Sequence, residues 1–260
     1  MKKSICKSLK GFLTFSILAV SLASVQKLHA QNNVVKNIVL VHGAFADGSG
    51  WKGVYDILTK KGYNVRIAQI PLTGLKEDVA ATQSILDRID GPVILVGHSW
   101  AGNVITEAGI DPKVAALVYV AAFLPDVGES AGQLVSSMPI APENGITAPG
   151  KDGYIFYDKA KFHAGFCADL TKSQSDFMEA TQVPIIASAF GSPAVNIAWK
   201  IKPSFAVVTL EDKNIPFALQ RQMYKRANST ITELKSSHVA YISHAGEVAS
   251  VIVSASKSGK

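Results

Sequence analysis

Ser99 is a candidate nucleophile, because it lies between a run of apolar residues and a segment with a helix-like pattern. In the segment VILVGHSWAGN, four apolar residues (93–96) lead directly into Gly97, His98 and Ser99. A nucleophilic serine on a sharp strand-to-helix turn needs small residues two positions away on either side, because the two backbones approach closely there. Gly97 and Ala101 are small, although Ala101 departs from the usual G-x-S-x-G pattern. The pattern predicts either a tight turn built from small residues or a mounted nucleophile.

A serine hydroxyl needs a base that accepts its proton and a carboxylate that orients the base. His238 follows the strand-like run TITELK (230–235) and opens the last helical stretch. It is therefore expected at the carboxyl end of a strand, where binding sites gather in open α/β sheets. The other histidines are better explained as structural, solvent-facing or N-terminal residues: His29, His42, His98, His163 and His244. We expect His238 to be the base.

Three carboxylates could orient this base. Glu211 and Asp212 follow the strand-like run FAVVTL (205–210), and Asp126 follows the preceding run in AAFLPD. Each of them could instead be a turn or helix-capping carboxylate. Asp212 is favoured because it gives the chain order Ser, Asp, His, with each residue after a separate late strand, which is a known order for such a triad.

Attack on a carbonyl would also require hydrogen-bond donors for the oxyanion. The segment LVHGAFADGSGW (40–51) places a Gly-rich loop after the first apolar run, so the amide of Ala44 could face the same site as the amide of Trp100. The same glycines could simply form a tight turn, with Asp47 or Ser49 capping the helix that follows.

The apolar runs and the segments between them indicate the fold that must position these residues. Helical spacing between the runs predicts a parallel sheet covered on both faces, hence a three-layer α/β fold with a mostly parallel sheet of about six strands. With 260 residues, 48% of them hydrophobic, the chain can form one large domain, expected over 31–260. The strand-like runs lie at 37–43, 62–70, 91–99, 113–123 and 204–212.

The alternation stops between about 126 and 203, where the sequence becomes polar, aromatic and punctuated by Gly and Pro. Structureless loops of this length are uncommon, so the segment should contain helices and form a cap inserted into the sheet domain. A cap is where substrate selection is expected, although part of its aromatic side chains should only pack it onto the sheet. The substrate-binding side chains are expected at Trp100, Phe45, Phe162, Phe166 and Phe190.

The first 30 residues are typical of a secretory signal peptide. A lysine-rich start precedes an apolar run over 11–23, and a short polar stretch then ends in Ala30. The run is short for a membrane span, although an uncleaved anchor is the alternative. Cleavage after Ala23 or Ala30 would leave Cys167 as the one cysteine of a periplasmic or secreted protein, without an internal disulfide.

Charge and ligand spacing argue against nucleic-acid binding and metal binding. The formal net charge is +6, but five lysines lie in the first 30 residues, and the remainder carries 21 basic and 20 acidic residues. His238 and His244 do not share a helical face, and no His/Cys/Asp cluster has metal-ligand spacing. We expect no cofactor, no nucleic-acid partner and no membrane insertion once the signal is removed.

Five motifs together resemble the α/β-hydrolases, in the esterase branch related to plant methylesterases and hydroxynitrile lyases: VHGAFADGSGW, GHSWAG, AAFLPDVGES, TLEDKNIPFALQ and SSHVAYISH. The resemblance implies Ser99 as nucleophile, Asp212 as acid and His238 as base. It also implies that Ala44 and Trp100 provide the backbone amides of the oxyanion hole.

Fold alone does not decide the reaction. The lyases that this chain resembles carry Thr where Gly43 stands and Lys where Val239 stands, and a dehalogenase needs a carboxylate at the position of Ser99. We therefore expect a carboxylesterase-type serine hydrolase that cleaves small, apolar or aromatic esters through an acyl-enzyme. The alternatives are lyase-like or other non-hydrolytic chemistry on the same triad, or a receptor for small molecules.

Overall fold

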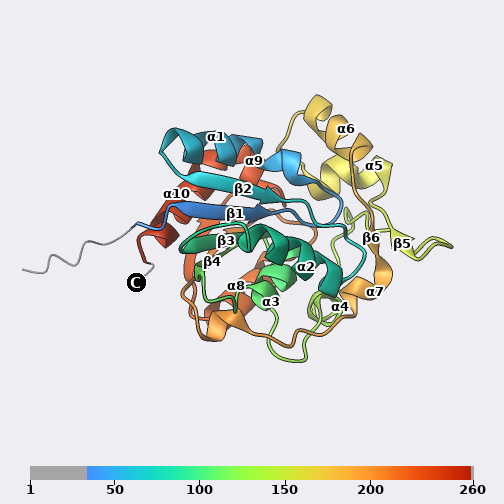
Figure 1. Cartoon of the computed structure of the whole chain (residues 1–260). Helices are drawn as coiled ribbons and strands as arrows, with labels where there is room; N and C mark the ends of the chain where they lie inside the picture. The colour runs from blue at the N-terminus through green and yellow to red at the C-terminus, as the bar shows by residue number, and fades with distance from the viewer. Residues whose placement is uncertain (1–33, 259–260) are drawn as a thin grey trace, which may run out of the picture. The chain divides into compact units, whose positions relative to one another are not determined.

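A computed structural model describes residues 34–258 and contains one six-stranded sheet with the strand order β2-β1-β3-β4-β7-β8 (Figure 1). Every neighbouring pair of strands in this sheet is parallel. The strands are β1 (Asn37–Val41), β2 (Asn64–Ala68), β3 (Val93–His98), β4 (Val114–Val120), β7 (Ser204–Thr209) and β8 (Thr230–Leu234). The predicted three-layer α/β fold with a parallel sheet is confirmed. The predicted signal peptide, residues 1–30, lies outside the described residues.

Burial along the strands follows from their place in the sheet. All six residues of β3 are buried, and β3 consists largely of Val, Ile and Leu because both faces of a central parallel strand are covered. The edge strands are more exposed, because β2 has one buried residue, Ala68, and every residue of β8 is exposed or partly exposed. The strand order reverses between β1 and β3, so the loops after these two strands diverge at a topological switch point, where open α/β sheets bind ligands.

Helices cover both faces of the sheet. Helices α1, α9 and α10 contact one another, and α10 packs against β3, β4 and β7. Helices α2 and α3 contact each other and the strands β1 to β4, while α8 packs against β7. Their bounds are α1 (Lys52–Lys60), α2 (Leu75–Leu86), α3 (Ala101–Ala108), α8 (Phe217–Arg226), α9 (Ala240–Ser243) and α10 (Ala245–Ser256). Within residues 34–258, no helix has the length and apolar character needed to cross a bilayer.

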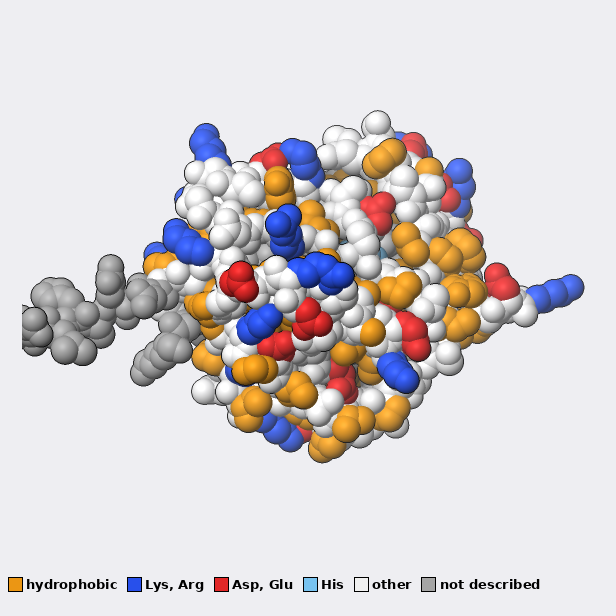
Figure 2. Space-filling view, viewed as in Figure 1, with side chains coloured by type: hydrophobic (Ala, Val, Ile, Leu, Met, Phe, Trp, Pro, Cys, Tyr) orange, Lys and Arg blue, Asp and Glu red, His pale blue; other side chains and the backbone are white. Residues whose placement is uncertain are grey.

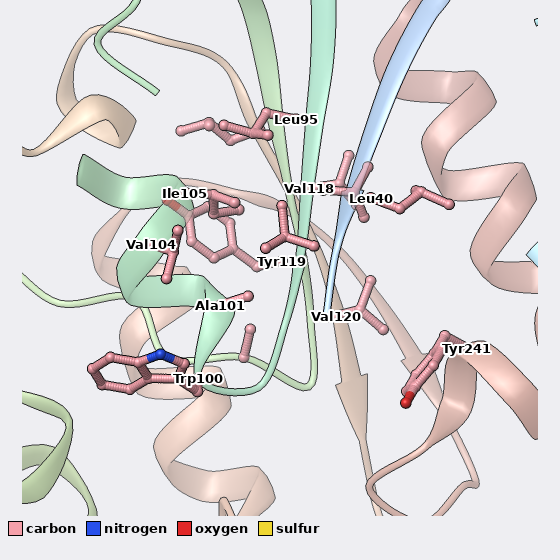
Figure 3. Close-up of a cluster of buried hydrophobic side chains, with 14 of the residues drawn as sticks. Leu40, Leu95, Trp100, Ala101, Val104, Ile105, Val118, Tyr119, Val120 and Tyr241 are labelled. Atoms are coloured by element: carbon pink, nitrogen blue, oxygen red, sulfur yellow. The ribbon is translucent and has the colours of Figure 1, made fainter. Parts of the chain in front are cut away.

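The core between α3 and the sheet holds the helix that follows the serine. Figure 3 shows Ala101, Val104 and Ile105 of α3 lying beside Leu95 and Tyr119 of the central strands, and all five side chains are fully buried. Burying an aliphatic side chain of this size contributes about 1.5–3 kcal/mol to stability. The start of α3 is thus fixed by the core and does not belong to a mobile loop.

The predicted insert lies between β4 and β7 and has its own short elements. It contains α4 (Ala131–Ser136), β5 (Tyr154–Ile155), α5 (Lys159–Lys161), a π-helical turn (Phe162–Phe166), α6 (Lys172–Ala180), β6 (Ile185–Ile186), α7 (Ala187–Phe190) and a 3-10 turn (Ala198–Lys200). In addition to helices, the insert has a two-stranded antiparallel sheet of β5 and β6. Strands of two residues carry no periodic pattern, which is why the sequence did not predict them.

Two backbone hydrogen bonds fasten this insert to the loops of the sheet domain. The amide of Ile186 donates to the carbonyl of Leu72 at 2.9 Å, and the amide of Phe45 donates to the carbonyl of Val183 at 3.0 Å.

The face shown in Figure 2 carries Lys and Arg side chains interspersed with Asp and Glu.

Candidate active site

Ser99 occupies a strained turn between β3 and α3. Its φ is +53°, a left-handed conformation that costs a non-glycine residue about 1–2 kcal/mol. Backbone hydrogen bonds hold the turn, because the amide of Ser99 donates to Val120 and its carbonyl accepts from Gly102 and Phe123. Such a turn raises the serine side chain away from the strand.

Close backbone approach explains the small residues around the serine. A Cβ added to Gly97 would lie 2.7 Å from the carbonyl oxygen of Ala101, and one added to Gly102 would lie 1.9 Å from that of Phe123. Ala101 itself is fully buried. Positions 97 and 102 therefore require glycine. Position 101 does not, so the alanine that departs from the G-x-S-x-G pattern fits there.

The structure brings together the three predicted catalytic side chains. Nε2 of His238 lies 2.8 Å from Oγ of Ser99, and its Nδ1 lies 2.7 Å from Oδ2 of Asp212. All three residues are buried, with exposed fractions of 8% or less. A hydroxyl, an imidazole and a carboxylate in this order can pass a proton from the hydroxyl to the imidazole.

The carboxylate of Asp212 is held by four donors besides the imidazole. Oδ2 accepts hydrogen bonds from the hydroxyl of Thr209 and the side-chain amide of Gln220. Oδ1 accepts from the backbone amides of Asn214 and Ile215 at 2.7 and 3.0 Å. These bonds fix the plane of the carboxylate and direct Oδ2 toward the histidine.

The two other candidate acids do not contact this histidine. Asp126 forms an ion pair with Lys200 and accepts a hydrogen bond from the amide of Val127. Glu211 is half exposed and lies 3.7 Å from the ammonium group of Lys235. Among the three predicted carboxylates, Asp212 is thus the one placed on His238.

His98 supports the backbone of the candidate base. Its Nε2 lies 3.0 Å from the carbonyl oxygen of His238 and donates to it. Burial lowers the pKa of His98 far below its usual value, and the nearby charge of His238 when protonated lowers it further. His98 therefore stays neutral, with the proton on Nε2.

His42 plays a comparable part in the loop after β1. Its Nδ1 donates to the carbonyl of Gly43, and its Nε2 accepts from the amide of Ile70. Burial lowers the pKa of His42, which agrees with a neutral ring that donates on one side and accepts on the other. His163 and His244 lie elsewhere. The His163 ring is hydrogen-bonded to the carbonyl of Leu170, and His244 pairs with Glu247.

Two backbone amides are free to bind an oxyanion. Within the described residues, neither the amide of Ala44 nor that of Trp100 has a hydrogen-bond acceptor. The amide of the next residue, Phe45, is already bonded to Val183. Ala44 and Trp100 also line the same cavity as Ser99.

The cavity over the serine is small and apolar. Its volume is about 40 Å³, and Asn214 is its one polar lining residue apart from Ser99 and His238. The other lining residues are Ala44, Phe45, Trp100, Phe123, Val135, Ile146, Phe166, Phe190 and Ile215. A narrow apolar space of this kind accepts a small acyl group without rearrangement, whereas a larger group requires the walls to move.

Aromatic contacts build the walls of this cavity. Phe190 meets the Trp100 ring edge to face at 5.6 Å, and Phe166 meets the His238 ring at 5.2 Å. Phe162, which was expected to bind substrate, is not a lining residue. Its ring packs behind Phe166 at 5.0 Å.

Several residues of the site carry no signal in the sequence. Phe123, Val135, Ile146, Asn214 and Ile215 line the cavity because distant segments fold over it. Asp78 is another, and it accepts a hydrogen bond from the Trp100 indole. Among residues 34–258, no group of three or more His, Cys, Asp and Glu side chains could hold a metal ion.

The profile of the alpha/beta hydrolase family matches residues 38–251, and the chain belongs to this family. A carbendazim hydrolyzing esterase of Nocardioides sp. is 33% identical over 132 residues, which is 45% of this chain and 53% of that protein. A pyrethroid hydrolase of Sphingobium wenxiniae is 26% identical over 249 residues, or 84% of this chain and 86% of that protein.

Polyneuridine aldehyde esterase has a similar fold, with a TM-score of 0.72 over 85% of this chain and 98% of that structure, at 16% identity. The predicted membership of the α/β-hydrolases is confirmed by the family match, and polyneuridine aldehyde esterase shares the fold.

Proposed function

We propose that the protein is a serine hydrolase that cleaves carboxylic esters through an acyl-enzyme on Ser99. The observation that carries the proposal is the continuous hydrogen-bonded chain from Ser99 through His238 to Asp212, with distances of 2.8 and 2.7 Å. The similar proteins named as an esterase and a pyrethroid hydrolase support the same class of reaction.

The geometry suits a two-step reaction. Oγ of Ser99 attacks the ester carbonyl carbon while its proton moves to Nε2 of His238, and the resulting oxyanion accepts hydrogen bonds from the amides of Ala44 and Trp100. Collapse of this intermediate breaks the bond to the alcohol, which leaves with the proton from His238. A water molecule then gives a proton to His238 and attacks the acyl carbon, which releases the carboxylic acid and restores Ser99. Asp212 stabilises the protonated imidazole in both steps.

The cavity favours apolar esters of small acyl groups. Apart from Ser99, His238 and Asn214, its lining side chains are aliphatic or aromatic, and no lysine or arginine lines it to neutralise an anionic substrate. Burying a neutral polar group without a hydrogen-bond partner costs about 2–7 kcal/mol. Burying a charged substrate group in such a cavity would cost more.

Gly43 supports hydrolysis over the lyase alternative. A Cβ at this position would lie 2.7 Å from Cβ of Ser99 and 2.8 Å from the carbonyl oxygen of His98, so the threonine of the lyases has no space here. Val239, where those lyases carry lysine, is fully buried and brings no charge.

Hydrolysis of p-nitrophenyl esters by the purified protein tests the proposal. Ser99→Ala should lower the rate by about 10⁴-fold or more, because the nucleophile is removed. Ser250→Ala is the matched control, since Ser250 lies on the exposed face of α10 and bonds only to the carbonyl of Gly246. A fluorophosphonate should phosphonylate Oγ of Ser99 with release of fluoride, which adds the mass of the phosphonyl group to the peptide that contains Ser99. Equal rates for Ser99→Ala and the wild type would overturn the proposal.

We also propose that residues 1–30 direct export to the periplasm or the medium and that the mature enzyme works without a cofactor. The lysine-rich start and the apolar run over 11–23 support the export signal. Mass spectrometry of the exported protein should show a new N-terminus after Ala23 or Ala30. Full-length chain in the membrane fraction would favour an uncleaved anchor.

A further inference from the structure

Asp169 joins the inserted cap to the loop that carries the candidate base. It follows the π-helical turn of the cap, and its Oδ2 accepts hydrogen bonds from the Ser236 hydroxyl at 2.8 Å and the Ser237 amide at 3.0 Å. The same oxygen accepts from the Ser243 hydroxyl at 2.7 Å, and Oδ1 accepts from the Ser237 hydroxyl. Four donors from three serines thus meet on one carboxylate.

The serine pair 236–237 connects β8 to His238. Asp169 itself lies at the surface, but Ser236 and Ser237 are buried, so its carboxylate is bonded to an interior loop. On the opposite side, the carbonyl of His238 accepts from His98. Partial burial raises the pKa of Asp169, yet the hydrogen bonds from Ser237 and Ser243 outweigh this and lower it overall, so the charged form is favoured. Hydrogen bonds to a charged carboxylate are about twice as strong as those between neutral groups.

The neighbouring cap residues also reach both the acid and the base. The carbonyl of Gly165 accepts a hydrogen bond from the side-chain amide of Asn214 at 2.8 Å, and the backbone amide of Asn214 donates to Asp212. The ring of Phe166 packs against the His238 ring. Residues 165–169 therefore connect the cap to the two loops that carry Asp212 and His238.

We propose that Asp169 is a positioning residue for His238, so that docking of the cap sets the geometry of the base as well as covering the substrate. The inference rests on the proposed serine-hydrolase function. Asp169 does not line the active-site cavity, and it acts through the backbone of the 236–237 loop. Displacement of a catalytic group by about 1 Å can reduce turnover about 100-fold.

Ester hydrolysis by three variants tests the inference. Asp169→Ala removes the carboxylate that accepts all four hydrogen bonds, so kcat should fall about 10- to 100-fold while KM stays within about twofold. Asp169→Asn keeps an oxygen that can accept from the Ser237 amide, so it should restore part of the loss. Asp176→Ala is the matched control, because Asp176 is an exposed carboxylate of the adjoining helix paired with Lys172, and its kcat should equal that of the wild type.

A proton NMR spectrum gives a readout that does not depend on turnover. The Nδ1 proton of His238, bonded to Asp212, should give a low-field signal in the wild type and in Asp176→Ala. This signal should broaden or vanish in Asp169→Ala. If Asp169→Ala does not fold, the same comparison is made with Asp169→Asn and Ser237→Ala, each of which removes part of the contact.

The outcomes separate the two proposals. A variant with a lower melting temperature but wild-type kcat, KM and low-field signal would show a structural role alone and overturn the positioning role. Loss of the signal in Asp169→Ala, together with a wild type that hydrolyses no ester, would keep the positioning role and overturn the proposed function.

Discussion

The indole Nε1 of Trp100 donates a hydrogen bond to Oδ2 of Asp78 at 2.7 Å, and both residues are buried. The second carboxylate oxygen accepts from the amide of Leu72 at 2.7 Å. The carbonyl of Leu72 in turn accepts from Ile186 of the cap. One buried carboxylate thus orients a wall of the active-site cavity and the loop on which the cap docks.

Burial raises the pKa of Asp78 to about 6, although the hydrogen bonds from Trp100 and Leu72 oppose this change. Between its ordinary value of 3.8 and about 6, the folded protein keeps the proton that the unfolded chain loses. Stability therefore falls as pH rises through this window and is constant above it, with a difference of up to about 3 kcal/mol from this group.

Asp78→Asn should remove that contribution to the pH dependence. Urea unfolding of the wild type and the variant at several values between pH 4 and 7 measures it, because the difference between the two curves isolates Asp78 from the other carboxylates. The free energy of unfolding of the wild type should decrease relative to Asp78→Asn as pH rises. Parallel curves would contradict the raised pKa.

The choice of acid can be tested by paired substitutions. Asp212→Asn should lower kcat by about 10³- to 10⁴-fold, because the amide no longer holds the histidine in the required tautomer. Asp126→Asn should leave kcat within about twofold, since it removes only a surface ion pair. The reverse ranking would place the acid after β4.

Gly43→Ala should abolish most of the activity. The added methyl group would lie 2.7 Å from Cβ of Ser99, so the serine or the oxyanion loop must shift. The control is Gly246→Ala in α10, where an added Cβ has no neighbour within 4 Å and should stabilise the fold by about 0.4–1 kcal/mol. Melting temperatures and ester hydrolysis report the two effects separately, and an active Gly43→Ala enzyme would contradict the close packing.

Phe190→Ala should shift the preference of the enzyme toward longer acyl chains. Its ring lines a cavity of only about 40 Å³ and packs on Trp100, so truncation opens space beside the serine. The ratio of kcat/KM for octanoate to that for acetate esters should rise about tenfold, a usual effect of changing an apolar pocket. Phe177→Ala is the control, because that side chain is 63% exposed on α6. An unchanged ratio would mean that Phe190 does not limit the acyl group.

The sequence by itself identified the sheet and the setting of Ser99, because both depend on local features. Continuous apolar runs form buried strands, and the small residues at 97 and 102 are required by the turn in which the serine stands. Ala44 and Trp100 could be named for a similar reason, since each adjoins a loop at the end of an inner strand.

Only the tertiary structure decided which side chains meet. Asp212, Glu211 and Asp126 all follow strands, and the meeting of Asp212 with His238 depends on how the loops after β7 and β8 pack together. Phe162 and Phe166 share one short turn, yet only Phe166 reaches the cavity, because the Phe162 ring packs behind that of Phe166. Asp78 is hydrogen-bonded to Trp100, which lies 22 residues further along the chain, and Asp169 is hydrogen-bonded to Ser237, which lies 68 residues further along. Such contacts arise from the packing of the cap and helices on the sheet, which no local pattern in the sequence encodes.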